Sequence, residues 1–410
     1  MIIPSIDVMG GKAVQLRQGR ELLLTDPRDP VELAREFNRY GPVAVVDLDA
    51  ALGQGNNTEL IGRCCQVAEC RVGGGIRSEE DVRNWIKRGA RQVVIGTKAT
   101  PEFLSGFPRE WLIAAIDARG RSVVDQGWTR DTQADVVARA QELAPHCAAL
   151  LFTQVEREGM LAGPDLETAR ALRAAAGVPI VVAGGIRHAQ DAADLVREGF
   201  AAQVGRALYE GKLELADVWA ASVAFDERGL VPTIVQEART REVLMLAWSN
   251  ADSLAVALRE GVGCYWSRSR RELWRKGATS GHTQRLVAAR WDCDRDCVLF
   301  TVEQTGPACH TGTPTCFGST SGGVLAELEA TLAERKAGAG KKSYTQRLLA
   351  DAELLAGKLR EETEEVIVAP NYENLRWECA DLIYHLMVRM VADGMTVREV
   401  MDELRGRVRK

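Results

Sequence analysis

Three features are missing from this sequence, and each absence excludes a class of protein. No apolar run reaches the roughly 18 residues that a membrane-spanning helix needs, so no membrane protein is predicted. The start of the chain, Met1 to Pro4, has neither the basic residues nor the apolar stretch of an export signal. Positive charge is not in excess either, because the net charge is −5, and we expect no nucleic-acid surface.

What is present indicates a soluble globular chain of several domains. The 410 residues are 46% hydrophobic and 27% charged, and at about 100–200 residues per domain they predict two to four domains. Ten cysteines without an export signal favour a reducing, cytoplasmic location. In such a compartment clustered cysteines indicate metal binding or catalysis before disulfides.

Residues 1–222 alternate short β-branched runs with amphipathic helical stretches, a pattern typical of an α/β domain. Buried parallel strands are predicted at residues 43–46, 92–95, 111–116, 148–152 and 179–182, with helices at 78–89 and 165–176. Two architectures fit this alternation, a doubly wound sheet and a closed barrel.

An internal repeat favours the barrel. The pair Ile6-Asp7 recurs about 110 residues later as Ile116-Asp117, and the run from Gly74 to Arg77 recurs at Gly184 to Arg187. The pair Gly96-Thr97 returns at nearly the same offset as Gly205-Arg206. Two equivalent halves of four βα units each make a (βα)8 TIM barrel, whereas a doubly wound sheet requires no such equivalence.

Two repeated features are placed where a barrel carries its chemistry, at the carboxyl ends of the strands. Asp7 and Asp117 each end an apolar run, so we expect them to face each other across the mouth as general base and general acid. The alternative is that each aspartate caps a helix or turn.

The repeated glycines suit phosphate groups, because a chain without Cβ lets the backbone approach an anion closely. Two equivalent phosphate sites would bind a ligand with a phosphate at each end, although single glycine pairs often mark plain turns. The predicted phosphate-binding residues are Gly74, Gly75, Gly96, Thr97, Gly184, Gly185, Gly205 and Arg206.

The whole of this first region resembles a histidine-biosynthesis barrel, the isomerase of the bisphosphorylated aminoimidazole ribotide ProFAR. The matching runs are Ile2–Asp7, Gly11–Leu16, Val46–Ala51, Val72–Ser78, Gly127-Trp128 and Val204–Gly211. The resemblance implies an Amadori rearrangement, with Asp7 as base, Asp117 as acid and Thr153 positioning the substrate. Glu158 and Met160 depart from it, since they stand where the family has an aspartate and a threonine.

The residue pattern changes at about residue 223, and residues 223–322 are predicted to form a small α+β domain. Asp292, Asp294 and Asp296 alternate, so on a strand they would share one face and offer hard oxygen ligands to Mg²⁺ or Ca²⁺. Three cysteines without a fourth protein ligand indicate a catalytic zinc with an open position for water, the expected ligands being Cys293, Cys309 and Cys316. A solvated strand face and buried structural cysteines are the plainer alternatives.

This segment closely resembles phosphoribosyl-AMP cyclohydrolase, which opens the purine ring of PR-AMP by hydrolysis. The matching runs are Leu230–Gln236, Tyr265–Arg270, Leu273–Gly277, Thr279–Gln284, Asp292–Asp296 and Gln304–His310. The resemblance implies Zn²⁺ on the three cysteines, Mg²⁺ on the three aspartates, and a homodimer whose subunits share the cysteines. His310 beside Cys309 is a candidate proton shuttle. The expected contacts to a phosphorylated aromatic substrate are Arg268, Arg270, Trp274 and Lys276.

Residues 323–410 are predicted to form a helical bundle, joined to the preceding domain by a small, polar linker at 318–323 and broken at 337–342. Glu362 and Glu365, like Glu378 and Asp381, are three residues apart and therefore share a helix face. Packed antiparallel, the two helices would gather four carboxylates around Mg²⁺, although acidic helix faces are commonly just solvated.

These helices resemble phosphoribosyl-ATP pyrophosphohydrolase, an all-α enzyme that releases pyrophosphate from PR-ATP. The matching runs are Lys358–Glu362, Glu378–His385 and Ser343–Thr345, and the resemblance implies that Lys342, Ser343 and Tyr344 lie near the substrate.

Together the three resemblances predict a fused enzyme that performs three consecutive steps of histidine biosynthesis on small ribotides, with neither nucleic acid nor membrane as partner. Two alternatives stay open. One is a bifunctional hydrolase with a non-catalytic barrel as scaffold. The other is a phosphate-sensing regulatory protein with structural zinc, which the intact Asp7 and Asp117 and the open cysteine site disfavour.

Overall fold

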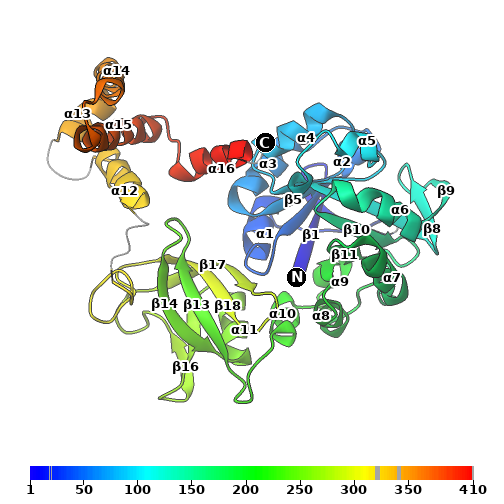
Figure 1. Cartoon of the computed structure of the whole chain (residues 1–410). Coiled ribbons are helices and arrows are strands. Elements are labelled where there is room, and N and C mark those ends of the chain that lie inside the picture. Colours follow the sequence, from blue (N-terminus) through cyan, green and yellow to red (C-terminus); the bar gives the residue numbers. More distant parts are fainter. Residues whose placement is uncertain (18, 20, 319–323, 339–342, 409–410) are drawn as a thin grey trace. The chain divides into compact units, whose positions relative to one another are not determined.

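The computed structural model describes residues 1–17, 19, 21–318, 324–338 and 343–408 (Figure 1). The chain divides into two units, one of Met1–Gln236 with Val243–Cys316, the other of Glu237–Glu242 with Phe317–Lys410. Most of the predicted linker at 318–323, most of the break at 337–342, and Lys342 itself lie outside the described residues. Within the described part, no helix is both long and apolar enough to cross a membrane.

A closed barrel of eight parallel strands begins the first unit, which confirms the predicted fold (Figure 1). Its strands are β1 (Ile2–Met9), β4 (Val43–Asp47), β5 (Cys70–Gly73), β6 (Gln92–Ile95), β7 (Leu112–Arg119), β10 (Ala149–Gln154), β11 (Ile180–Ala183) and β12 (Ala201–Val204). Each strand pairs in parallel with the next along this order, and β1 closes the ring on β12. The doubly wound alternative is therefore wrong, because an open sheet would leave two edges.

Helices surround the barrel, and two hairpins extend its mouth. The helices are α1 (Pro30–Phe37), α2 (Leu48–Leu52), α3 (Thr58–Val67), α4 (Glu79–Lys87), α5 (Pro101–Leu104), α6 (Val136–Leu143), α7 (Leu166–Ala176), α8 (Ala189–Arg197), α9 (Arg206–Tyr209) and α10 (Leu215–Ser222). The added strands, β2 (Lys12–Arg17) with β3 (Glu21–Thr25) and β8 (Ser122–Asp125) with β9 (Arg130–Asp135), are antiparallel extensions of β1 and β7.

A second sheet follows the barrel in the same unit. Its order is β14 (Val243–Ser249), β13 (Val231–Glu237), β18 (Val298–Gln304) and β17 (Gln284–Trp291), with helix α11 (Ala251–Glu260) and the hairpin β15 (Cys264–Ser267) and β16 (Glu272–Arg275) beside it. One continuous hydrophobic core includes residues of the barrel and of this sheet. Trp219 of α10 is fully buried in it, as is Phe300 of β18. The two folds are thus packed as one body.

The second unit is helical, as predicted. It consists of α12 (Val324–Lys336), α13 (Tyr344–Ala350), α14 (Ala352–Val368), α15 (Tyr372–Ala392) and α16 (Val397–Val408). Its separate, small core is formed by Leu332, Leu348, Leu355, Met387, Val388 and Val391. Other large apolar side chains stay outside this core, notably Tyr372 at 78% and Trp377 at 67% exposure.

Candidate active sites

The mouth of the barrel brings the repeated aspartates onto the same end of the sheet. Asp7 lies in the carboxyl-terminal half of β1, and Asp117 in that of β7. The hydroxyl of Ser5 donates a hydrogen bond of 3.1 Å to Asp7. The buried Thr153 of β10 is the direct neighbour of Asp117 in the β7–β10 register, and its side chain is hydrogen-bonded to the Asp117 carboxylate.

Burial controls the proton affinity of both acids. It raises the pKa of Asp7 to about 6, against the opposing effect of the Ser5 hydrogen bond. It also raises the pKa of Asp117, although Trp128 and Thr153 donate hydrogen bonds to that carboxylate. A carboxyl group with a pKa of about 6 and a second one with a raised pKa, both at one mouth, are groups of the kind that acid–base catalysis uses.

A third acid, Glu158, belongs to this mouth and was not among the predicted site residues. Burial first, and then the negative charges of Asp7 and Asp117, raise its pKa to about 7. The sequence showed Glu158 only as a departure from the isomerase pattern. Trp128 was also missed as a partner of Asp117, although the run Gly127-Trp128 signalled it.

The four paired glycines have positive φ values of 69–94°, which side chains rarely adopt. A Cβ on Gly74 would lie 2.2 Å from the carbonyl oxygen of Asp47, and one on Gly185 would lie 2.3 Å from that of Gly163. Close backbone packing therefore requires these glycines, whatever they bind. In contrast, a Cβ on Gly96 would meet nothing within 4 Å, so this position has room for an anion.

The remaining predicted phosphate residues already have protein partners. A Cβ on Gly205 would lie 3.1 Å from Oε1 of Gln15. The guanidinium of Arg206 donates to the carboxylate of Glu210 at 2.5 Å and to the carbonyl of Gly159. The hydroxyl of Thr97 accepts a bond of 3.4 Å from the backbone N–H of Gln126. Arg206 would have to exchange partners to bind a phosphate.

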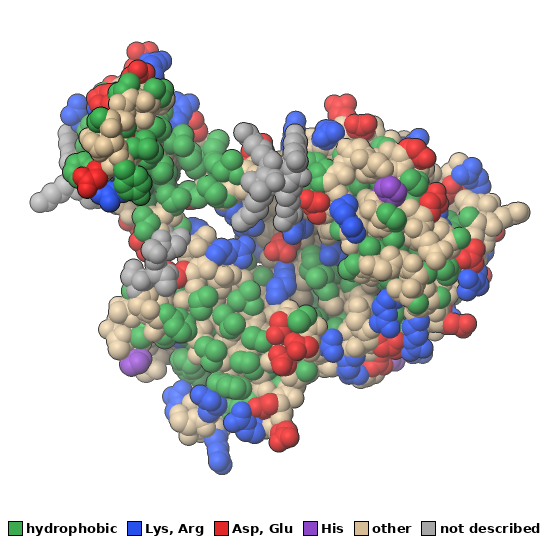
Figure 2. Space-filling view, in the orientation of Figure 1, with side chains coloured by type: hydrophobic (Ala, Val, Ile, Leu, Met, Phe, Trp, Pro, Cys, Tyr) green, Lys and Arg blue, Asp and Glu red, His purple; other side chains and the backbone are tan. Residues whose placement is uncertain are grey.

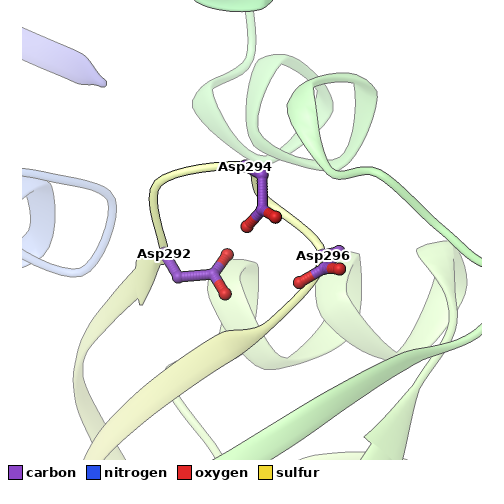
Figure 3. Close-up of side chains that lie close together, drawn as sticks. All are labelled: Asp292, Asp294 and Asp296. Atoms are coloured by element: carbon purple, nitrogen blue, oxygen red, sulfur yellow. The ribbon is translucent and has the colours of Figure 1, made fainter.

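The three aspartates after β17 converge as expected, but not on a strand. Strand β17 ends at Trp291, and Asp292, Asp294 and Asp296 lie in the loop before β18. Figure 3 shows their carboxylates pointing toward one another, and one oxygen of each lies within 4.8 Å of the others. The strand prediction is wrong because Arg295 takes a left-handed conformation, φ +70°, which turns the chain instead of extending it.

This arrangement concentrates negative charge on exposed side chains. The pKa of Asp296 is raised by the charge of Asp294 first, then by desolvation and by Asp292. A backbone N–H at Cys297 donates to Asp292 at 3.2 Å and closes the loop. A hard divalent cation would relieve the repulsion, so the donor set fits Mg²⁺.

Two of the three predicted zinc ligands are neighbours, and the third is apart. Cys309 and Cys316 are within hydrogen-bonding distance of each other, and the Thr311 hydroxyl lies 3.1 Å from the Cys309 sulfur. Hydrogen bonds, first from Thr311, lower the pKa of the Cys309 thiol to about 6. Cys293 lies on the aspartate loop, and among the described residues it forms no three-ligand group with the other two.

The neighbours of these cysteines complete the polar surroundings. His310 is exposed, and its Nδ1 lies 3.9 Å from the Cys309 sulfur. Burial, together with the adjacent Cys309, raises the pKa of the Cys316 thiol. Two soft sulfur donors, one of them readily ionised, fit part of a zinc site.

The predicted substrate residues separate into two groups. Arg268 and Trp274 line one open pocket with Trp248 and Trp266, two indoles that the prediction missed. The Arg268 guanidinium lies 4.7 Å from the centre of the Trp248 ring, a cation–π contact. The other two, Arg270 and Lys276, are not in the pocket. Arg270 pairs with Glu272, and Lys276 donates to the carbonyl of Ala308.

The helical unit gathers carboxylates from two helices. Glu362 and Glu365 of α14 and Glu378 of α15 each have an oxygen within 4.8 Å of the others. Asp381 lies outside this group of three. Desolvation is the main cause that raises the pKa of Glu362 and of Glu378, and the charge of Asp381 adds to it in both. The acids were thus predicted to be together, and three of the four form the tight group.

A buried histidine supports this cluster and was not predicted as part of it. Nδ1 of His385 lies 2.9 Å from the carbonyl oxygen of Asp381 and 3.5 Å from Glu362, and both side chains are almost fully buried. The ring of Tyr344 contacts the His385 ring edge-on at 6.4 Å, while Ser343 caps α13. The signal in the sequence was the run Glu378–His385, in which only the acids were considered.

The fold and these sites define a multidomain enzyme: a barrel with acid groups at its strand ends, a domain with clustered cysteines and aspartates, and a helical unit with a carboxylate cluster. Three family models match the chain in this order. They are histidine biosynthesis protein over residues 1–214, phosphoribosyl-AMP cyclohydrolase over 245–318, and phosphoribosyl-ATP pyrophosphohydrolase over 325–407.

Curated relatives agree with the family models. The chain is 41% identical over 202 residues to the histidine biosynthesis bifunctional protein HisIE of Halalkalibacterium halodurans, a match that covers 46% of this chain and 96% of the relative. It is 66% identical over 97 residues to the phosphoribosyl-AMP cyclohydrolase of Micrococcus luteus, covering 24% and 77%. A trifunctional histidine biosynthesis protein of Kluyveromyces lactis is 43% identical over 174 residues, covering 42% and 22%.

The chain therefore belongs to the histidine biosynthesis protein family, as a fused enzyme with cyclohydrolase and pyrophosphohydrolase domains. Those two domains are hydrolases, and the barrel is isomerase-like.

Proposed function

We propose that the chain converts PR-ATP to PR-AMP and pyrophosphate, opens the purine ring of PR-AMP to give ProFAR, and isomerises ProFAR in the barrel. The single observation that carries this proposal is that each of the three matched regions presents a separate cluster of reactive side chains. The order of the domains is opposite to the order of the reactions.

In the barrel, the aspartates of β1 and β7 are the proposed acid–base pair. Asp7, with a pKa of about 6, is largely ionised at neutral pH and can accept a proton from the sugar. Asp117, whose pKa burial also raises, is the proposed acid, and in its protonated form it can donate a proton to the opening ring oxygen. Thr153 and Trp128 fix the orientation of Asp117 through their hydrogen bonds.

In the cyclohydrolase domain, thiolates and carboxylates are proposed to hold different cations. Cys309 and Cys316 with Cys293 would hold Zn²⁺, and the three aspartates would hold Mg²⁺. Zinc supplies a lowered pKa for water and therefore a nucleophile at neutral pH. The indoles of Trp248, Trp266 and Trp274 offer stacking surfaces for a purine, and Arg268 offers a cation.

The separation of the cysteines supports a homodimer through this domain. Cys293 does not join Cys309 and Cys316 within one chain, although three ligands are needed for an open zinc site. In a twofold dimer, Cys293 of one subunit can meet the other two cysteines of its partner, twice over.

In the helical unit, Glu362, Glu365 and Glu378, with Asp381 nearby, are proposed to hold Mg²⁺ for cleavage of a phosphoanhydride. Carboxylates that repel one another are stabilised when a cation binds between them, and the raised pKa values of Glu362 and Glu378 reflect that repulsion in part.

A single incubation tests the proposed sequence of reactions. The purified full chain is supplied with PR-ATP, Zn²⁺ and Mg²⁺, and the products are separated over time. We expect pyrophosphate first, then ProFAR, then its isomer. Accumulation of ProFAR without the isomer would leave a bifunctional hydrolase on a scaffold barrel and overturn the barrel assignment.

A further inference from the structure

Strand β17, which leads into the aspartate loop, is attached to the barrel at successive residues. The backbone N–H of Ala289 donates to the carbonyl of Arg39 at 2.7 Å. The guanidinium of Arg290 donates to the carbonyl of Asn38 at 3.2 Å and lies 3.5 Å from Glu69. The last three residues of β17 therefore run along the barrel.

The end of that strand is fixed by a pair of indoles. The ring of Trp291 lies 4.7 Å from that of Trp219 in α10, tilted by 52°. Trp219 is fully buried, and its indole N–H donates to the carbonyl of Tyr40 at 3.1 Å. Trp291 immediately precedes Asp292, so the first carboxylate of the loop starts from a fixed point.

The middle of the loop is attached a second time. The carbonyl of Arg295 accepts a bond of 2.9 Å from the backbone N–H of Ala224, just after α10. Its guanidinium lies 3.5 Å from the carbonyl of Val196 in the last turn of α8, where a helix favours positive charge. Arg295 thus points to the barrel, while its neighbours Asp294 and Asp296 point to each other and to Asp292 (Figure 3).

We propose that the barrel positions the aspartate loop, with Arg295 as the positioning residue. Three carboxylates repel one another, and a loop held only by β17 and β18 at its two ends would let them spread apart. Attachment at Trp291 and again at Arg295 holds them at the spacing that a divalent cation needs. The barrel is then a structural part of the cyclohydrolase site, in addition to its own activity. This inference rests on the proposed Mg²⁺ role of the aspartates.

The test removes one contact between the aspartate loop and the barrel at a time, first from the loop and then from the barrel. Arg295→Asn removes the guanidinium but keeps a residue that tolerates positive φ. Ala224→Pro removes the barrel N–H without altering the loop. Arg271→Asn is the matched control, because Arg271 also has positive φ (54°) but lies in the β15–β16 turn. Every protein is the full chain with Glu365→Gln and Glu378→Gln, so that the helical carboxylates do not contribute.

Mn²⁺ binding, measured by electron paramagnetic resonance of the free ion, is the readout besides cyclohydrolase rate. We expect Arg295→Asn and Ala224→Pro each to weaken Mn²⁺ binding about tenfold, as loss of residues that orient metal ligands does. Arg295→Lys should recover part of the affinity, and Arg271→Asn should bind normally. Circular dichroism confirms that each variant is folded.

Failure of the positioning role and failure of the Mg²⁺ site give different results. If Asp294→Asn abolishes Mn²⁺ binding but Arg295→Asn and Ala224→Pro bind as tightly as the parent, the positioning role is wrong and the Mg²⁺ site stands. If Asp294→Asn leaves Mn²⁺ binding unchanged, the proposed Mg²⁺ site itself is wrong, and the positioning role fails with it.

Discussion

The barrel mouth and the cysteine site of the cyclohydrolase domain are built in opposite ways. Asp7 and Asp117 belong to strands of one closed sheet, so the fold of a single chain is enough to bring them to the same end. Cys293, Cys309 and Cys316 belong to exposed loops, and one chain brings only two of them together. A site on the strands of a barrel is complete by topology, whereas a site on loops depends on what packs against them.

The largest effect is expected at the loop site. Cys309→Ser should abolish ring opening and lower the zinc content, because a hydroxyl is a poor substitute for a thiolate ligand. Pyrophosphate release from PR-ATP should be unchanged. Elemental analysis and product separation check both. An active Cys309→Ser protein would refute the zinc role, and Cys147→Ser, at a buried cysteine of the barrel, controls for the effect of a cysteine-to-serine change.

The next largest effect is expected at the barrel mouth. Asp7→Asn should slow isomerisation about 10²–10⁴-fold, the usual contribution of a positioned acid or base, and leave both hydrolytic steps intact. Asp29→Asn is the control, since Asp29 only caps α1 and asparagine caps equally well. A normal rate of isomer formation in Asp7→Asn would show that the barrel site does not use this carboxylate.

A mixed dimer tests directly whether a site is shared between two subunits or is complete within one chain. Coexpressed Cys293→Ser and Cys309→Ser chains should recover roughly a quarter of the ring-opening activity, because half of the dimers are mixed and each of these has one intact site. The same experiment with Asp7→Asn and Asp117→Asn should recover none, because each barrel carries its own pair. Absence of recovery with the cysteine variants would place the zinc site within one chain.

The smallest effect is a shift in pH dependence. If Asp7 is the base, as proposed, it acts in its ionised form, so the isomerisation rate should be full above its pKa of about 6 and fall as the pH drops through that value. Initial rates from pH 5 to 8 check this. Glu158→Gln should change the profile chiefly above pH 7, where Glu158 would otherwise be charged beside both aspartates. An identical profile in that variant would exclude Glu158 from the site.

The sequence was sufficient for the barrel because its repeat has a direct geometric meaning. Asp7 and Asp117 are as far apart in the sequence as the two glycine runs are, because both pairs occupy matching positions in two equivalent halves of the chain. Two such halves of βα units form a closed barrel. Helical spacing likewise predicted that Glu362 and Glu365 share a face. The long-range repeat and the helical period were both reliable guides.

Features that depend on local backbone conformation or on contacts between distant residues were not predicted. Alternation suggested a strand for Asp292 to Asp296, and a single left-handed residue, Arg295, changed it to a loop. Trp248 and Glu158 carry no motif of their own and are recognised only by their neighbours in space. His385 was passed over because burial, which makes it a partner of Glu362, cannot be read from its position in the chain.

The shared core of the first unit has a consequence for how the gene could be divided. Cutting the chain between α10 and β13 would leave the two indoles of Trp219 and Trp291, on separate polypeptides, facing water. Each half would then be prone to aggregate, whereas the helical unit, with its own core, could be released as an independent fragment. On heating, the barrel and the second sheet should accordingly melt as one cooperative block, and calorimetry would record fewer transitions than the three regions that the family models match.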